Sequence, residues 1–351
     1  MKTNTFYCAI LTALICIGCN HTNKETVISE TKKETKTRIL PAAPPKQEEK
    51  KDSVKTIEYG YDNSMFGYFR FPVSNVQDSI PSEEIDGTQF LCGFEVDEDS
   101  LMYFVGENPL QVACFNQTRT MLYRRVIEGH ETEYDMMCMR NDSIYIVDEI
   151  HHTLLRMHKD GTGSVEEMLL ADDSIRQCKF LDNCFMAYRE EGEISFDELS
   201  ENKWNQKTYD YAANLLDERT ITLTHLDTLL TDSPIKSLDI NEEGALWYYR
   251  SYIGEYKGLY LYYRLKWLEN GEGRMELRLH DKEGNMIYTR WVDNSRLPMF
   301  ILRSKNRKWR YLHFPEYEMV RNGKMYSLGY AWKTNTFIVA TIDLAVAFPD
   351  L

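Results

Sequence analysis

The sequence lacks the short motifs by which several enzyme classes can be identified. It contains no GxSxG, P-loop or GxGxxG motif, which argues against a nucleophile-elbow hydrolase and a phosphate-binding loop. Residues 233–236 match SxxK, but the SDN and KTG companions of that motif are missing, so the match is at chance level. We therefore expect no cofactor, and a non-enzymatic role is favoured.

The cysteine content predicts no disulfide framework. The chain has eight cysteines; three lie in the first 19 residues, and the other five are odd in number, so at least one is unpaired. These five form no CxxC motif, and each lies in an apolar run, where a free thiol behaves as a small buried hydrophobe. A Cys178–Cys184 disulfide would span one turn, and we do not expect it. The five are Cys92, Cys114, Cys138, Cys178 and Cys184.

Positive charge is scarce. The formal net charge of the chain is −14 at pH 7. Residues 20–57 contain more lysine and arginine than acid, so residues 58–351 are more acidic still. Because phosphate groups are bound by clustered lysine and arginine, we expect no nucleic-acid partner.

The sequence has no hydrophobic run long enough for a permanent transmembrane helix. Its main apolar run lies near the N-terminus and is short. Residues 6–17 are apolar, follow Lys2 and end at Gly18 and Cys19. This length and position fit a removable signal better than a permanent transmembrane helix. Residues 20–57 are polar, with three prolines and little apolar content, which predicts a flexible tether. Residues 58–351 are then the candidate folded domain.

Residues 15–19, Ile-Cys-Ile-Gly-Cys, resemble the lipobox of bacterial lipoproteins, although Cys16 stands where that family usually has leucine. The resemblance implies a signal peptide over residues 1–18, lipid on Cys19 and a lipidated tether over residues 19–57. Lipid chains would hold the protein on a membrane surface, which the resemblance places at the outer membrane, on either face. The alternative is ordinary signal-peptidase cleavage with Cys19 unmodified.

Residues 141–161 show the unit that organises the rest of the chain. They contain a polar turn, a short apolar run at residues 144–147, a polar corner, a second run at residues 153–158 and an Asp-Gly turn. Short runs rich in β-branched and aromatic residues between turn residues predict β-strands. Fainter copies begin at residues 99, 182, 241 and 321, so the period is near forty.

This unit resembles one NHL-type blade, through Tyr145, Asp148 and His152 with residues 155–157 and 160–161. Together with the lipobox, the chain resembles a six-bladed β-propeller lipoprotein of Gram-negative bacteria. The fold class expected is therefore all-β, a β-propeller over residues 58–351. Six blades are expected and seven would also fit, because a blade takes roughly 40–45 residues. The alternative fold is a pair of β-sandwiches, which the long repeat disfavours.

Two regions fit the repeat poorly. Residues 200–232 contain a helix-like patch at residues 209–216 and are interpreted as an insertion between blades. Residues 293–316 are basic and aromatic, and their strands are left unassigned.

One local group has the residue types of a metal site. Asp148, His151 and His152 lie within five residues, and imidazole and carboxylate are common ligands of zinc. No HExxH pattern or second ligand pair supports the site. The interpretation preferred is a polar corner between two strands, with no metal.

Residues 247–267 are the most aromatic part of the chain. Tyr260, Tyr262, Arg264 and Lys266 alternate with apolar residues, as on a strand with two unlike faces. These four side chains are the candidate binding platform for a glycan or a peptide. The competing interpretation is that the tyrosines fill the space between blades, since aromatic residues favour strands in any case.

The function expected is binding without chemistry. A closed ring of blades would leave one loop-built face as a rigid platform for a protein or glycan partner, with the domain itself monomeric. The alternative is a polysaccharide hydrolase or lyase with carboxylates on the central face of the propeller. A purely structural component of the envelope is the third hypothesis.

Overall fold

A computed structural model describes residues 56–73, 80–81, 83–85, 88–106, 109–131, 136–171, 175, 177–191, 202–223, 247–267, 273–292, 312–331 and 334–351. These residues belong to one compact unit, Asp52–Leu351. Among them, no helix is long and apolar enough to cross a membrane. The predicted signal peptide, Cys19 and the predicted tether as far as residue 55 lie outside the described residues.

The described strands form five sheets of four or five strands and one short ribbon. The first sheet contains β5 (Gly93–Val96), β6 (Met102–Gly106), β7 (Gln111–Phe115) and β8 (Met121–Val126). The second contains β9 (Met137–Arg140), β10 (Ser143–Asp148), β11 (Thr153–His158) and β12 (Glu166–Leu169). The third contains β13 (Gln177–Phe180), β14 (Phe185–Glu191), β15 (Asn202–Tyr209) and β16 (Leu215–Leu223).

The fourth sheet contains β17 (Trp247–Tyr256), β18 (Leu259–Trp267), β19 (Gly273–His280) and β20 (Met286–Val292), with β1 (Ile57–Tyr59) at its edge. The fifth contains β21 (Leu312–Arg321), β22 (Lys324–Ala331) and β23 (Thr336–Asp343), with β2 (Phe66–Pro72) at its edge. The ribbon pairs β3 (Glu83–Ile85) with β4 (Thr88–Phe90). Two short helices, η1 (Asn63–Met65) and α3 (Leu344–Ala347), complete the described elements.

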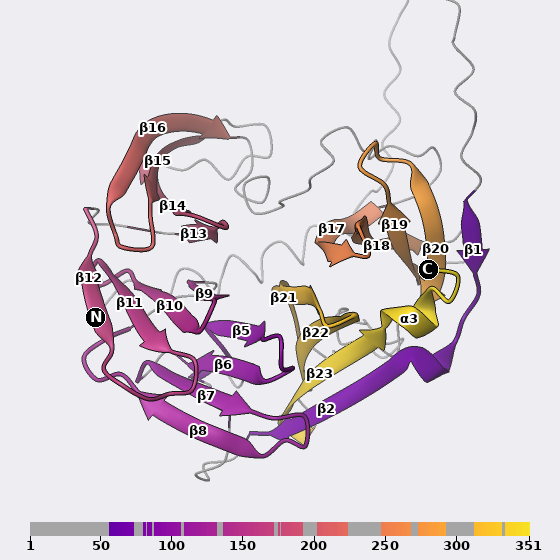
Figure 1. Cartoon of the computed structure of the whole chain (residues 1–351), viewed down its shortest axis with the longest axis horizontal. Helices are drawn as coiled ribbons and strands as arrows, with labels where there is room; N and C mark the ends of the chain where they lie inside the picture. The colour runs from indigo at the N-terminus through magenta and orange to yellow at the C-terminus, as the bar shows by residue number, and fades with distance from the viewer. Residues whose placement is uncertain are drawn as a thin grey trace, which may run out of the picture. The chain divides into compact units, whose positions relative to one another are not determined.

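Figure 1 shows the five sheets around a common centre, with β5, β9, β13, β17 and β21 innermost. Within each sheet, consecutive strands run antiparallel. This arrangement is that of an all-β propeller, as the sequence predicts.

The predicted unit at residues 141–161 is confirmed. The two expected strands are β10 and β11, which pair antiparallel with Ile144 opposite Met157. The turns on either side contain Asn141 (φ 49°) and Gly161 (φ 79°), which adopt left-handed backbone conformations. Gly161 also needs its small size, because an added Cβ would lie 2.6 Å from the ring of Tyr123 on the first sheet.

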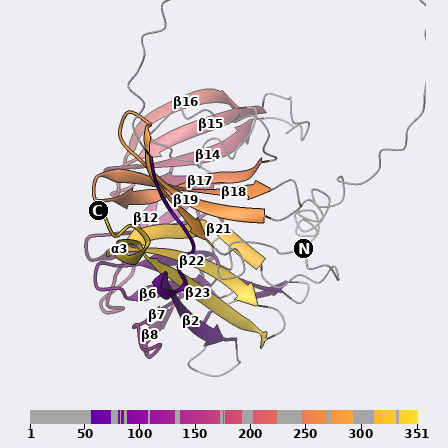
Figure 2. The same ribbon diagram turned by 90° about the vertical axis from the view of Figure 1, so that its right-hand side faces the viewer.

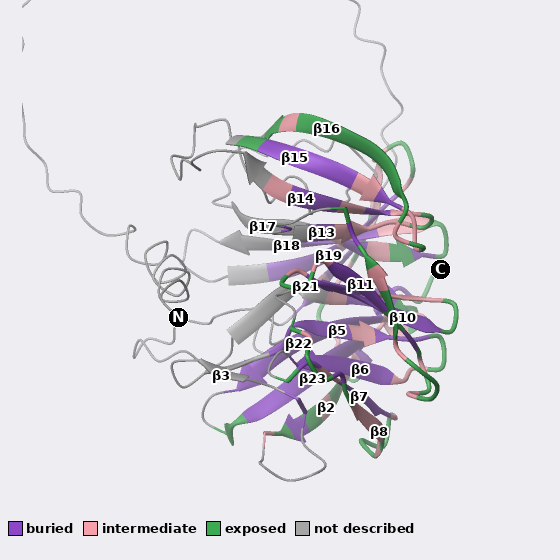
Figure 3. Ribbon diagram, turned by 90° about the vertical axis from the view of Figure 1, so that its left-hand side faces the viewer, coloured by how far each residue is buried: buried purple, intermediate pink, exposed green. Residues whose placement is uncertain are grey.

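Middle strands are buried on both faces where their sheet packs between two neighbours, as the second sheet does between the first and the third. All six residues of β10 are buried. Ile144 and Ile146 pack in a cluster with the first sheet, whereas Tyr145 and Val147 pack in a cluster with the third sheet. This double burial explains why β10 is a continuous apolar run rather than an alternating one. Figure 3 shows the same contrast between buried β10 and the largely exposed edge strand β16.

The N-terminal strands close the ring. β2 pairs antiparallel with β23 over its whole length, from Phe66 opposite Ile342 to Pro72 opposite Thr336 (Figure 2). β1 adds in parallel to β20 of the fourth sheet. Strands from the two ends of the domain therefore share one sheet, which ties the first described residues to the last.

Arg290 strengthens this closure from the fourth sheet. Its side chain is buried and donates hydrogen bonds to the carbonyl oxygens of Ala347 (2.6 Å), Gly60 (2.7 Å) and Val346 (3.3 Å). Its guanidinium carbon also lies 4.7 Å from the centroid of the Tyr59 ring, within cation–π range. One side chain thus joins β20, the N-terminal segment and α3.

The five described sheets are one fewer than the six blades expected. Several described strands are long: β15 has 8 residues, β16 has 9, β17 has 10 and β18 has 9. The third and fourth sheets therefore use more chain than a period near forty. The first described residues also contribute to ring closure instead of starting a blade.

The helix-like patch predicted at residues 209–216 is wrong. This stretch is the β15–β16 hairpin turn, between Tyr209 and Leu215. The Asp210 carboxylate accepts hydrogen bonds from the backbone N–H groups of Ala212 and Asn214, and Ala213 takes a left-handed conformation (φ 62°). The interpretation of residues 200–232 as an insertion is wrong for the described part, because β15 and β16 are two strands of the third sheet. Of residues 293–316, only 312–316 are described, and they belong to β21.

We predict that Phe71→Ala weakens the closure of the ring. Phe71 is 4% exposed, and its ring lies 5.1 Å from that of Phe104 and 5.2 Å from that of Phe115. Loss of a buried Phe side chain should lower the free energy of unfolding by about 3–5 kcal/mol. The control Tyr68→Ala, on the same strand but 39% exposed, should cost about 1 kcal/mol or less. Denaturant unfolding of both variants measures this, and equal costs would contradict the closing role of Phe71.

Candidate functional site

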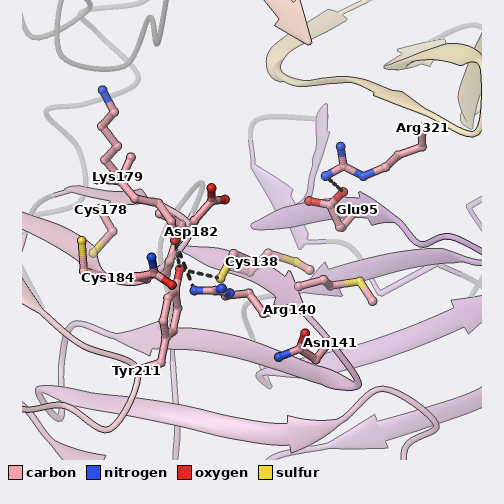
Figure 4. Close-up of a pocket in the computed structure, with 15 residues that line it drawn as sticks. Glu95, Cys138, Arg140, Asn141, Cys178, Lys179, Asp182, Cys184, Tyr211 and Arg321 are labelled. Atoms are coloured by element: carbon pink, nitrogen blue, oxygen red, sulfur yellow. Dashed lines mark hydrogen bonds and ion pairs between the residues drawn. The ribbon is translucent and has the colours of Figure 1, made fainter. Parts of the chain in front are cut away.

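A cavity of about 920 Å³ lies beside the inner strands of the propeller. Its walls come from β5, β9, β13, the β13–β14 and β15–β16 turns, and the end of β21. Figure 4 shows charged, aromatic and sulfur-containing side chains from these elements around the cavity. The charged residues are Glu95, Arg140, Lys179, Asp182 and Arg321.

Arg140 and Tyr211 are held together on one wall. The guanidinium carbon of Arg140 lies 4.5 Å from the centroid of the Tyr211 ring, within cation–π range. Arg140 Nη1 and Tyr211 Oη both donate to the carbonyl oxygen of Leu181, at 3.5 and 2.8 Å. These contacts fix an arginine from β9 beside the turns of the third sheet.

Glu95 and Arg321 join the first and fifth sheets on the other wall. Arg321 Nη2 donates to Glu95 Oε1 at 3.0 Å, and the Val96 backbone N–H donates to the same oxygen at 3.2 Å. Burial nevertheless raises the pKa of Glu95 above its ordinary value of 4.5, and the charge of Arg321 offsets only part of that rise. Glu95 is therefore a carboxyl group that holds its proton more firmly than a surface glutamate does.

Three cysteines, Cys138, Cys178 and Cys184, also line the cavity, and all three are free thiols. The disulfide between Cys178 and Cys184 that we did not expect is not formed. Burial raises the pKa of the Cys138 thiol to about 12. A thiol that stays protonated is a poor nucleophile and a poor metal ligand, so Cys138 is a lining residue and not a reactive group.

The predicted corner residues lie elsewhere, at the other end of β10 from the cavity. Nδ1 of His151 lies 2.8 Å from Asp148 Oδ2, so the structure brings these two predicted residues together. It adds His130, whose Nδ1 lies 2.7 Å from the same oxygen. His152 is not in the group; it takes a left-handed conformation (φ 54°) at the turn. His130, Asp148 and His151 are the group of possible metal ligands among the described residues.

Sequence reasoning missed His130 because it stands 18 residues from Asp148. Only the packing of the β8–β9 connection against the β10–β11 turn brings the two together. The cavity residues were missed for the same reason, since they come from four different sheets. The available signal was a charged residue near the end of each innermost strand, at Glu95, Arg140 and Lys179.

The predicted tyrosine platform lies on β18. Tyr262 is 2% exposed, with its ring 5.3 Å from that of His280 and 5.5 Å from that of Tyr252. Tyr260 is partly buried. The side chains of Arg264 and Lys266 lie outside what the structure describes. Tyr262 fills space between strands, and ligand binding by these four residues stays a prediction.

No protein-family model and no curated protein sequence matches the chain. Among solved structures, the chain resembles the glutaminyl cyclase of Myxococcus xanthus, with a TM-score of 0.37 and 8% identity over 82% of this chain and 99% of that one. It resembles a streptogramin B lyase with a TM-score of 0.34 and 9% identity over 79% and 98% of the two chains. A catalytically inactive virginiamycin B lyase from Staphylococcus aureus gives a TM-score of 0.31 and 8% identity over 79% and 99%.

Likenesses at these scores transfer no activity to this chain. The class assigned here rests on the five sheets themselves: the protein is a β-propeller with a polar cavity beside its inner strands.

We predict that Glu95→Gln changes the pH dependence of stability. A carboxyl group with a raised pKa in the folded state contributes stability that is fully present below its unfolded pKa and is lost as pH rises through the folded pKa. Glutamine cannot ionise, so the variant does not lose stability in this way as pH rises. The free energy of unfolding of the variant, relative to the unmodified chain, should therefore increase as pH rises from about 4 to 7.

Denaturant unfolding at a series of pH values measures the difference. Glu255→Gln, at an exposed position on β17, is the control for loss of a surface carboxylate. A relative stability that is flat or falls with rising pH would contradict the raised pKa of Glu95.

Proposed function

We propose that the propeller is a binding module whose cavity takes a polar ligand, a glycan or an extended peptide with an acidic group. The observation that carries this proposal is that charged side chains from separate sheets meet at one cavity. Glu95, Arg140, Lys179 and Arg321 come from four different sheets and line one cavity. Ligand sites typically combine a concave wall with a few placed polar groups, and a ring of blades holds such groups on rigid strands.

The charges of the cavity favour an acidic group on the ligand. Three cationic side chains line it against two acidic ones, Glu95 and Asp182, although the chain as a whole is acidic. Arg321 is paired with Glu95, and Arg140 and Lys179 line the cavity together with Asp182. Arginine presents a planar fork that pairs well with a carboxylate. Tyr211 adds an aromatic surface of the kind that supports a sugar ring or a peptide side chain.

A thermal-shift screen of the full chain against acidic and neutral oligosaccharides and peptides tests this proposal. A ligand present at a hundred times its dissociation constant should stabilise the fold by about 2.7 kcal/mol. Lys179→Gln should weaken binding of an acidic ligand by roughly 10- to 150-fold, since a charge-assisted hydrogen bond contributes about 1.5–3 kcal/mol.

Lys203→Gln is the matched control, because Lys203 is exposed on β15 of the same sheet as Lys179 and does not line the cavity. Equal loss of affinity in the two variants, or no stabilisation by any acidic or neutral compound, would count against the cavity as the ligand site.

A second candidate function, a polysaccharide hydrolase or lyase, is favoured by one observation. Glu95 is a partly buried carboxyl group with a raised pKa, and Asp182 lines the same cavity. A general acid must hold its proton near the working pH, and a glycosidase pairs such an acid with a second carboxylate. Release of shorter products from a polysaccharide, abolished in Glu95→Gln, would establish the enzyme. Binding of the polysaccharide without release of shorter products would instead support the binding module.

We also propose that the ring is complete with five blades. The support is the length of the intervals between described sheets. The interval of residues 224–246 and the interval of residues 293–311 are each shorter than residues 137–169, which form the shortest described sheet. The likeness of this second sheet to an NHL-type blade remains part of the proposal.

Attachment to the outer membrane through Cys19 is a further part of the proposal, and its support is the lipobox-like sequence. We predict that Cys19→Ala moves the protein from the membrane fraction to the soluble fraction, because the variant has no thiol at which lipid chains can be added. Cys16→Ala, three residues earlier, is the control and should stay with membranes. Fractionation and mass measurement of the mature N-terminus decide this, and an unmodified Cys19 would exclude the anchor.

A further inference from the structure

We propose that His130, Asp148 and His151 bind a divalent transition-metal ion at a site separate from the cavity. The β9–β10 turn beside the cavity and the β10–β11 turn that contains this group leave opposite ends of β10. The two sites share no lining residue.

Three ligand atoms converge in this group. One ligand atom from each of the three residues lies within 4.8 Å of the other two, and Nδ1 of His130 and Nδ1 of His151 lie 2.7 and 2.8 Å from Asp148 Oδ2. Asp148 is fully buried, the side chain of His130 is 9% exposed and that of His151 is 48% exposed. The group therefore has a buried floor and one side open to solvent, through which an ion can enter.

The Asp148 carboxylate is oriented by its own turn. Its Oδ1 accepts hydrogen bonds from the backbone N–H groups of Ile150 (3.0 Å) and His151 (2.9 Å). These bonds fix the plane of the carboxylate and direct Oδ2 toward the two imidazoles. Such support of a ligand by neighbouring hydrogen bonds is typical of metal sites.

The surroundings of His130 point to a cation. Its Nδ1 lies 2.7 Å from Asp148 Oδ2, and its Nε2 lies 3.2 Å from Glu167 Oε1. A neutral imidazole has one N–H and one acceptor nitrogen, so it can donate to only one of these two carboxylates. The other nitrogen would then face an oxygen as acceptor against acceptor. Either a second proton on the imidazole or a metal ion on Nδ1, with Nε2–H directed at Glu167, removes this conflict, and metal titration distinguishes the two.

The ligand set suits zinc and similar ions. Zinc binds neutral imidazole nitrogen and carboxylate oxygen at about 2.0–2.2 Å and keeps one open position in sites with three protein ligands. Two tetrahedral ligands at such distances lie roughly 3.4 Å apart, so Asp148 Oδ2 and the imidazoles must separate by roughly half an ångström. His151 is half exposed on a turn and can make this movement.

A bound ion would clip two connections together. His130 belongs to the connection between the first and second sheets, whereas Asp148 and His151 belong to the β10–β11 turn. An ion that binds only the folded chain stabilises it by mass action. The site is therefore a clip between adjacent blades, with a solvent-facing position for water or a further ligand.

Titration calorimetry of the full chain, first stripped with a chelator and then titrated with Zn²⁺, tests the proposal. We expect one ion per chain at this site. His130→Gln and His151→Gln should each weaken binding by more than a hundredfold, since loss of an outer partner alone costs about 10–100-fold. Glu167→Gln should fall within that smaller range.

His158→Gln is the matched control. His158 on β11 lies 2.7 Å from Asp160, and both side chains are half exposed, so this pair has the same chemistry without a third ligand. Its loss should leave Zn²⁺ affinity unchanged. The visible absorption of bound Co²⁺ should likewise disappear in His151→Gln and persist in His158→Gln.

Two results would overturn the proposal. One is an absence of Zn²⁺ binding by the stripped, folded chain, and the other is binding that His151→Gln leaves unchanged. In either case the group is a protonated, hydrogen-bonded corner that only supports the fold. His151 is on an exposed turn, so this variant remains informative even if His130→Gln does not fold.

Discussion

The pairing of β2 with β23 is the constraint on which the rest of the structure depends. Each middle strand, such as β6 or β10, is buried on both faces, and this is achieved only when a sheet has a neighbour on each side. Without the N-terminal strand, the fifth sheet would lack its outer strand and Phe71 would leave the aromatic cluster with Phe104 and Phe115. Closure therefore protects the apolar surfaces between the fifth and first sheets.

Aspartate carboxylates that accept backbone N–H groups occur at the ends of several strands, but they have different further contacts. Asp97 and Asp210 each accept backbone N–H groups two and four residues ahead, and so they support turns. Asp148 accepts the backbone N–H groups two and three residues ahead with one oxygen. The difference is that its second oxygen faces two imidazoles. Burial raises the pKa of Asp148, but the His151 backbone N–H and then the two imidazoles outweigh it and keep that pKa below its ordinary value. A common turn residue thus becomes the centre of a candidate metal clip.

The cavity and the clip use the two ends of one strand in different ways. At the cavity end, the inner strands present Glu95, Arg140 and Lys179 from successive sheets, so spacing between the groups is set by the packing of whole blades. At the clip end, two connections bring His130 to Asp148 within hydrogen-bonding distance. A ring of rigid sheets can hold both sites because ligand contacts at one end do not require the strands to move at the other.

The sequence by itself determined the local structure of this protein. Alternating or doubly apolar runs with Asx and glycine turns were sufficient to predict the strands at residues 144–147 and 153–158, the all-β class and the repeat, because these features depend on neighbours in the chain. The helix-like patch at residues 209–216 failed because the Asp210 turn and pairing with β14 override a weak local preference. Tertiary structure alone decided the closure by β2, the five described sheets, the cavity and the place of His130 beside Asp148. Each of these depends on contacts between residues far apart in the chain, and such contacts leave no fixed spacing in the sequence.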